Sequence, residues 1–112
     1  MDKSVSQLLI ASITPYFLEK NNLWFKENIS HILEARESQS FFKENILFLQ
    51  QGNQEGLSQL LKQLDEFGYE KVFAVEQPGE FTYRGGILDV FPINTNNAFR
   101  IEFTGNKIES IE

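Results

Sequence analysis

The sequence contains no cysteine and only one histidine, and these absences exclude much of the chemistry that a small domain can perform. Without cysteine there is no disulfide framework, no thiolate nucleophile and no cysteine-ligated metal site. The single histidine, His31, has Ile32 and Leu33 beside it in a helical pattern. We therefore interpret His31 as a surface or partly buried helix residue, not as a metal ligand or a general base.

Basic residues are also scarce, with 10 Lys and Arg against 16 Asp and Glu and a formal net charge of -6. A module that binds phosphate backbones by itself normally carries a basic surface, so direct nucleic-acid binding is not expected. Lys20, Lys26 and Lys43 stand near aromatic residues, as in a stacking surface for single-stranded nucleic acid. Solvated lysines beside core aromatics are the favoured interpretation.

Long hydrophobic runs and nucleotide-binding loops are missing as well. The apolar stretch in MDKSVSQLLIASITPYF is too short, and too often interrupted by Ser and Thr, for a signal peptide or a membrane span. A cytoplasmic location is expected by default, with no membrane partner. The chain has neither GxGxxG nor GxxxxGK[ST], so we expect no cofactor here. The paired carboxylates Asp65-Glu66 and Glu109/Glu112 are interpreted as solvated surface groups, which leaves no catalytic residue.

What the chain does contain is enough apolar sequence for one modest core, including 11 Phe residues. Apolar residues in 5–13 follow an i, i+3, i+4, i+8 pattern, which predicts an amphipathic helix that Thr14-Pro15 interrupts. An aromatic stretch with a turn at Asn21-Asn22 follows, and helical spacing resumes over 27–37. The Ser-Gln-Ser sequence at 38–40 is the predicted boundary.

We therefore divide the chain into an N-terminal helical extension, residues 1–40, and a second unit, residues 41–112. The second unit begins with a predicted buried strand over 45–50, a helix along the Leu57 to Phe67 stripe that ends at Gly68, and a strand over 71–75.

The last third is predicted to be a mainly antiparallel meander. Strands at 81–84 and 87–91 flank Gly85-Gly86, a dipeptide that can adopt the positive φ angles of a hairpin turn. A polar loop leads to an alternating strand over 98–103, and a final strand over 108–111 is cut short by the chain end, which suggests a piece of something longer. The predicted fold class is α+β.

Two arginines in this meander are candidate partner-binding residues. Arg84 falls at the tip of the hairpin, and Arg100 lies on the polar face of its strand, so both should reach solvent. A guanidinium can bind a carboxylate with two bonds, which favours arginine as a binding anchor. If Phe91 pairs with Ala98, however, Asp89 lies opposite Arg100 and an ion pair would occupy it. The spacing leaves both interpretations open for Arg100, and for Arg84 a solvated turn residue is the simpler alternative.

The residues from 65 to 112 resemble the UvrB-interaction domain that the repair helicase UvrB and the transcription-repair coupling factor share. The resemblance is carried by a GY-x-(x)-V segment, then PGEF-x-x-RGG-I-x-D-V-FP, then RIEF-x-G-x-x-IESI. It extends back to Asn45, and Glu80 in the PGEF sequence is more similar to the coupling factor than to UvrB. Residues 1–40 match nothing that we can place, and a reduced remnant of a preceding domain is one interpretation.

This resemblance implies a UvrB domain 2-like fold and a protein-docking function. The family domain docks on UvrA, the damage-recognition ATPase of nucleotide excision repair, and Arg84 and Arg100 stand at positions that contact it. The family often has a second aromatic where this chain has Thr104, which removes an apolar anchor and leaves the strength of UvrA binding open.

The parent protein implied by the resemblance is an ATP-dependent DNA translocase that couples stalled transcription to repair. ATP would belong to that parent, whose other domains are further candidate partners. This chain is not expected to be an enzyme, because it has no Walker or helicase motif. A nucleic-acid contact module and a purely structural domain of a larger helicase remain the alternatives.

Overall fold

The computed structural model describes residues 4–112, and its centre is a five-stranded sheet with the strand order β3-β4-β5-β6-β7. The strands pair antiparallel except for β3 and β4, which are parallel. Their bounds are β3 (Glu70–Lys71), β4 (Glu80–Arg84), β5 (Ile87–Phe91), β6 (Phe99–Thr104) and β7 (Lys107–Ile111). Helices and strands share one chain and the strands form open sheets, so the fold is α+β, as predicted.

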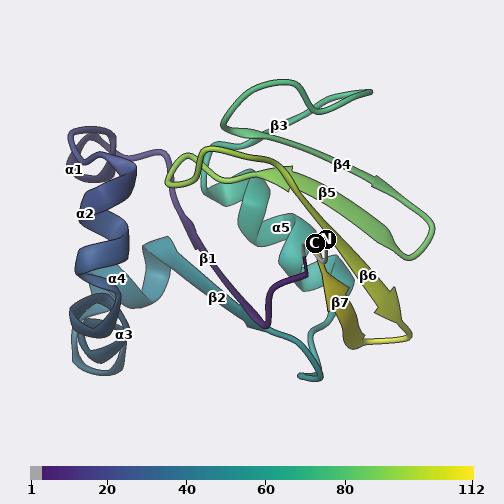
Figure 1. Ribbon diagram of the computed structural model, residues 1–112, viewed down its shortest axis with the longest axis horizontal. Coiled ribbons are helices and arrows are strands. Elements are labelled where there is room, and N and C mark those ends of the chain that lie inside the picture. Colours follow the sequence, from purple (N-terminus) through teal and green to yellow (C-terminus); the bar gives the residue numbers. More distant parts are fainter. Residues whose placement is uncertain (1–3) are drawn as a thin grey trace.

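A second sheet of two antiparallel strands, β1 (Gln7–Ala11) and β2 (Ile46–Gln50), separates two hydrophobic cores. Side chains on one face of this two-stranded sheet, such as Leu8 and Leu49, pack with α5 (Leu57–Glu66) and the five-stranded sheet. Side chains on its other face, such as Leu9 and Ile46, pack with the helices on the opposite side. Figure 1 shows these helices as a lobe on the left and α5 on the right of the two strands.

The predicted N-terminal helix is wrong, because its central residues form strand β1. Residues from Leu8 to Ala11 are all buried, since the strand contacts a core on each face. A strand buried on both faces has no polar alternation, and its apolar positions then fit a helical pattern as well. The pairing that decides the matter is non-local, because Ala11 lies opposite Ile46.

The helical lobe consists of four short helices: α1 (Pro15–Leu18), α2 (Asn22–Glu27), α3 (Ile29–Ser38) and α4 (Ser40–Asn45). Helix α3 confirms the helix predicted over 27–37. Thr14 begins α1 instead of ending a helix, because its hydroxyl accepts a hydrogen bond from the Phe17 amide. The turn predicted at Asn21-Asn22 is the start of α2, where the Asn21 side chain accepts from Trp24 N at 2.8 Å.

The predicted boundary at 38–40 falls between α3 and α4. Strand β1 on one side of it pairs along its whole length with β2 on the other side. The division into residues 1–40 and 41–112 stays a prediction, and residues 1–3 of the first segment lie outside the described residues.

Helix α5 and the C-terminal meander confirm the predictions made for them. Leu60 and Leu64 of α5 are buried against the sheet, and Gly68 follows the helix with a φ of 90°. In the β4–β5 hairpin only Gly85 of the two turn glycines has a positive φ, of 61°. Gly86 is needed for another reason: a Cβ there would lie 2.9 Å from the carbonyl oxygen of Phe103.

Two buried polar side chains tie β1 to the loop that joins β5 to β6. The Asn94 amide pairs with β1 as another strand would, because it accepts from Ala11 N at 3.0 Å and donates to Leu9 O at 2.8 Å. The Tyr69 hydroxyl donates to Ala11 O at 2.8 Å and accepts from Ile93 N at 3.0 Å. Burial raises the pKa of Tyr69 above its ordinary value, so the phenol stays neutral.

Candidate protein-docking surface

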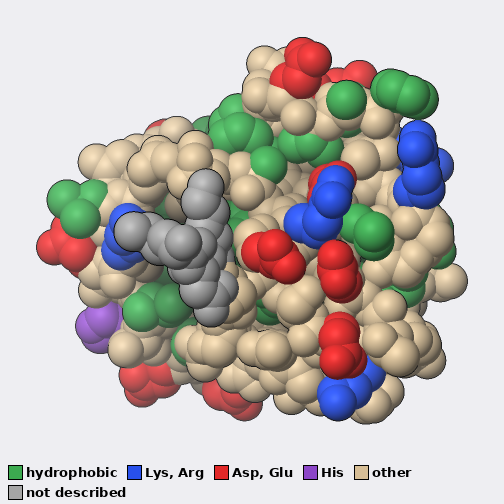
Figure 2. Space-filling view, turned by 45° about the vertical axis from the view of Figure 1, so that its right-hand side comes forward, with side chains coloured by type: hydrophobic (Ala, Val, Ile, Leu, Met, Phe, Trp, Pro, Cys, Tyr) green, Lys and Arg blue, Asp and Glu red, His purple; other side chains and the backbone are tan. Residues whose placement is uncertain are grey.

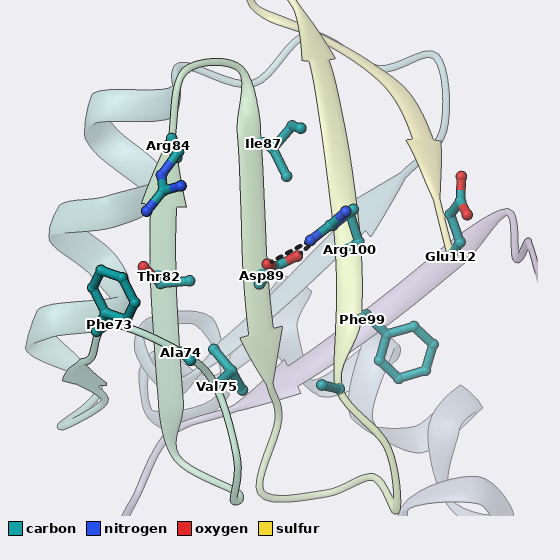
Figure 3. A pocket seen from close by; sticks show the side chains of 11 residues that line it. Phe73, Ala74, Val75, Thr82, Arg84, Ile87, Asp89, Phe99, Arg100 and Glu112 are labelled. Carbon is teal, nitrogen blue, oxygen red and sulfur yellow. Dashed lines mark hydrogen bonds and ion pairs between the residues drawn. The ribbon is translucent and has the colours of Figure 1, made fainter.

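The side of the five-stranded sheet that faces away from α5 and β1, here called the outer face, carries both candidate arginines. Successive side chains of a strand point to opposite faces, so Leu88 and Val90 enter the core while Ile87 and Asp89 point outward. The outer face comprises Thr82, Arg84, Ile87, Asp89 and Arg100. It borders a shallow hollow of about 620 Å³, which residues 73–75 close on one side (Figure 3).

Arg100 is held by Asp89 through two hydrogen bonds on the outer face. Its Nε donates to Asp89 Oδ1 at 2.8 Å and its Nη2 donates to Oδ2 at 3.1 Å. The two residues lie directly opposite in the β5–β6 pairing, so the cross-strand ion pair that the spacing left open is confirmed. This hydrogen bonding raises the pKa of Arg100, and the nearby carboxylates of Glu102 and Glu112 add to the effect. The pair stays open to solvent, with 55% of the Arg100 side chain exposed.

Arg84 differs from Arg100 because within residues 4–112 the structure records no ion pair for it. It is the last residue of β4, it lies opposite Ile87 at the hairpin turn, and it is exposed, as predicted. Its recorded side-chain contact is with an aromatic ring: the guanidinium carbon lies 5.8 Å from the centre of Phe73. The Arg84 guanidinium is therefore available to a carboxylate on a partner.

Thr104, the third predicted partner-binding residue, is exposed at the end of β6 and lies opposite Lys107. It does not line the hollow that Arg84 and Arg100 share. A register irregularity between Glu102 and Phe103 separates it from Arg100 along the strand. The structure thus places the two arginines together on the outer face and Thr104 at the end of one strand.

Phe73 is a prominent residue of this surface that the sequence interpretation placed wrongly. The strand predicted over 71–75 ends at Lys71, and Phe73 lies on the following loop with 88% of its surface exposed. An apolar KVFAV segment is typical of a buried strand, so its composition predicts the opposite of what the structure has. In the structure the Glu80 carboxylate accepts from the amides of Glu76 and Gln77 and stabilises a turn in this loop.

The outer face carries charges of both signs. Figure 2 shows basic and acidic side chains close together on this side of the molecule, with hydrophobic side chains among them. Among residues 4–112 there is no cluster of His, Cys, Asp or Glu that could hold a metal ion. No helix in the same part of the chain is long and apolar enough to cross a membrane. An exposed arginine, a second paired arginine and an exposed aromatic ring are typical components of a protein-binding surface.

Comparison with known proteins identifies the domain. Residues 47–112 match the family described as UvrB interaction domain. This chain belongs to the UvrB interaction domain family. The resemblance that the motifs indicated is thereby confirmed, including its extension back to β2.

The curated relatives include both kinds of protein that the motifs indicated. The chain is 39% identical over 70 residues to the transcription-repair-coupling factor of Bacillus subtilis, an alignment that covers 62% of this chain and 6% of that protein. It is 32% identical over 101 residues to UvrABC system protein B of Streptococcus agalactiae, covering 89% of this chain and 15% of that protein.

Similarity also reaches the N-terminal residues for which the sequence alone indicated no relative. UvrABC system protein B of Lactobacillus acidophilus is 27% identical over 112 residues, which is 99% of this chain and 16% of that protein. The chain thus spans only a small part of the curated relatives it matches.

Proposed function

We propose that this domain docks on UvrA in nucleotide excision repair, as part of a transcription-repair coupling factor that links stalled transcription to repair. The observation that carries the proposal is the placement of Arg84 and Arg100 on one outer face of a domain whose family is an interaction family. The 39% identity to the transcription-repair-coupling factor of Bacillus subtilis, over 62% of this chain, supports the choice of parent protein.

The charges around the arginines favour a protein partner over a nucleic acid. Asp89 binds Arg100 directly, and Glu102 and Glu112 lie close enough to raise its pKa. A phosphate backbone would be repelled by these carboxylates, whereas a folded protein can place one carboxylate at Arg84 and neutral groups elsewhere. In this arrangement Arg84 contributes the stronger new ion pair, and Arg100 contributes through the outward side of its guanidinium.

Thr104 sets an expected limit on affinity. It is exposed and lies outside the hollow, so it adds a polar contact at the margin of the docking surface and no apolar anchor. Replacement by an aromatic residue, Thr104→Phe, is therefore expected to tighten UvrA binding by roughly 3- to 10-fold.

The proposal is tested by titrating purified UvrA against the wild-type chain and the Arg84→Ala/Arg100→Ala double variant. We expect the double variant to bind about 30-fold more weakly or worse, because exposed arginines are frequent binding anchors. A matched control is Lys20→Ala/Lys43→Ala, which removes the same charge from the helical lobe. Equal affinity of the arginine variant and this control would contradict the assignment of the surface.

A further inference from the structure

Phe73 is the most exposed large hydrophobic side chain in the part of the chain that the structure describes. Its exposed fraction is 88%, against 60% for Leu23 and 59% for Leu18. Single exposed hydrophobic residues are common and need no explanation by themselves. Phe73 differs from the others in two ways. Hydrogen bonds fix the loop that carries it, and it lies beside Arg84, for which residues 4–112 provide no ion partner.

The loop that carries Phe73, residues 72–79, is fixed at both ends and at its turn. At its start Val72 N donates to Phe81 O at 2.9 Å, and at its end Gly79 N donates to Phe91 O at 2.8 Å. Gly79 itself requires glycine, because its φ is 87° and a Cβ would lie 3.2 Å from Ile13 Cδ1.

At the turn of this loop the Glu80 carboxylate accepts from Glu76 N at 2.9 Å and from Gln77 N at 3.0 Å. These two hydrogen bonds lower the pKa of Glu80 below its ordinary value, so the carboxylate remains charged and keeps both amides at neutral pH. A loop organised before binding loses less conformational entropy when a partner docks. The loop therefore holds the Phe73 side chain in an exposed position before a partner binds.

Arg84 lies beside the ring, so the partner needs a negatively charged group next to the site that takes the ring. Its guanidinium lies 5.8 Å from the ring centre, within the range of a cation–π contact. Val75 and Ile87 line the adjoining hollow, so the apolar contact continues past the ring (Figure 3). A complementary surface would combine an apolar socket for the ring with a carboxylate at its rim for Arg84.

We propose that Phe73 is an apolar anchor of this domain, which enters a socket on UvrA whose rim carries a carboxylate that binds Arg84. This inference rests on the proposed function, and it assigns the loop 72–79 to the same docking surface as the two arginines. Charge complementarity favours this partner, because Arg84 has no ion partner among residues 4–112 and a cation beside an exposed ring favours an acidic rim.

The test compares Phe73→Ala with Leu23→Ala, whose side chain is also highly exposed but lies on α2 in the helical lobe. Affinity for full-length UvrA is measured by calorimetry, and thermal unfolding is recorded for each variant. We expect Phe73→Ala to weaken binding by about 10- to 30-fold and Leu23→Ala to leave it unchanged, as for a central aromatic anchor. Phe73→Leu should retain more affinity than Phe73→Ala, and no variant should change the unfolding midpoint, because the ring is exposed.

A double-mutant cycle separates this inference from the function on which it rests. If Phe73→Ala and Arg84→Ala act on one contact, their combined effect should be smaller than the product of the single effects by about 2- to 5-fold. Normal affinity of Phe73→Ala, together with weak binding of the Arg84→Ala/Arg100→Ala variant, overturns the anchor and leaves the docking function standing. Absence of UvrA binding by the wild-type chain overturns both.

Discussion

The two faces of the five-stranded sheet are built from the same strands, but one packs in the core and the other is open to solvent. On the inner face Leu88, Val90 and Ile101 have no exposed surface, and they pack against α5 and the β1–β2 layer. On the outer face Arg100 is more than half exposed, and its charge is balanced within the sheet. The inner face therefore determines stability, whereas residues on the outer face can change with little effect on folding.

The largest expected effect is the loss of an inner-face side chain. Leu88→Ala leaves a cavity in the main core and should lower the free energy of unfolding by about 2 to 5 kcal/mol. Thr82→Ala, on the outer face of the neighbouring strand, is the matched control and should change it by less than about 0.5 kcal/mol. Denaturant unfolding followed by circular dichroism measures both, and similar midpoints for the two variants would contradict the distinction between the faces.

An intermediate effect on the free energy of unfolding is expected for Tyr69, whose buried hydroxyl makes two hydrogen bonds. Tyr69→Phe removes the hydroxyl that accepts from Ile93 N and donates to Ala11 O, and the buried groups left without a partner should cost about 1 to 3 kcal/mol. Chemical denaturation of the variant measures this loss.

The contribution of Tyr69 to the free energy of unfolding should also depend on pH. Because folding raises the pKa of Tyr69, its contribution to stability is complete below the ordinary tyrosine value of 10.0 and is lost as the pH rises above that value. The difference in unfolding free energy between wild type and Tyr69→Phe should therefore shrink at alkaline pH. A difference that stays constant above pH 10.0 would show that the hydroxyl is not protected by burial.

The smallest effect should come from the outer face itself. Asp89→Asn removes the carboxylate that holds Arg100 and frees the guanidinium for a partner carboxylate, so UvrA binding should tighten by roughly 2- to 5-fold. Little change in thermal stability is expected, because exposed ion pairs contribute little. Calorimetric titration would decide the role of Asp89, since weaker binding by this variant would mean that Asp89 orients Arg100 for its partner.

Local patterns predicted the parts of the fold whose partners are close in sequence. Helix α5 follows from its leucine stripe, and the β4–β5 hairpin follows from Gly85-Gly86 between two short strands. The pairing of Asp89 with Arg100 was one of two open interpretations, because strand alternation specified their shared face but the loop conformation between β5 and β6 set the register.

Long-range contacts decided the parts that the patterns mispredicted. The residues of β1 fit a helical pattern, but their pairing with β2 makes them a strand. Asn94 looks like an ordinary loop residue in the sequence, but its amide forms two hydrogen bonds with the backbone of β1. Phe73 is an exception that involves short-range contacts. It has the apolar neighbours of a buried strand, yet it lies on a loop whose turn is stabilised by hydrogen bonds from the amides of Glu76 and Gln77 to the Glu80 carboxylate.

The sequence by itself determined the family of this domain, the alternation of the C-terminal strands and the exposure of its two arginines, because motifs, period-two patterning and turn glycines act over short distances. Tertiary structure alone decided that Arg100 is bound to Asp89 while Arg84 lacks an ion partner within residues 4–112, and that Phe73 lies beside Arg84. The physical reason is that burial and pairing are properties of contacts between distant segments, which no local pattern contains.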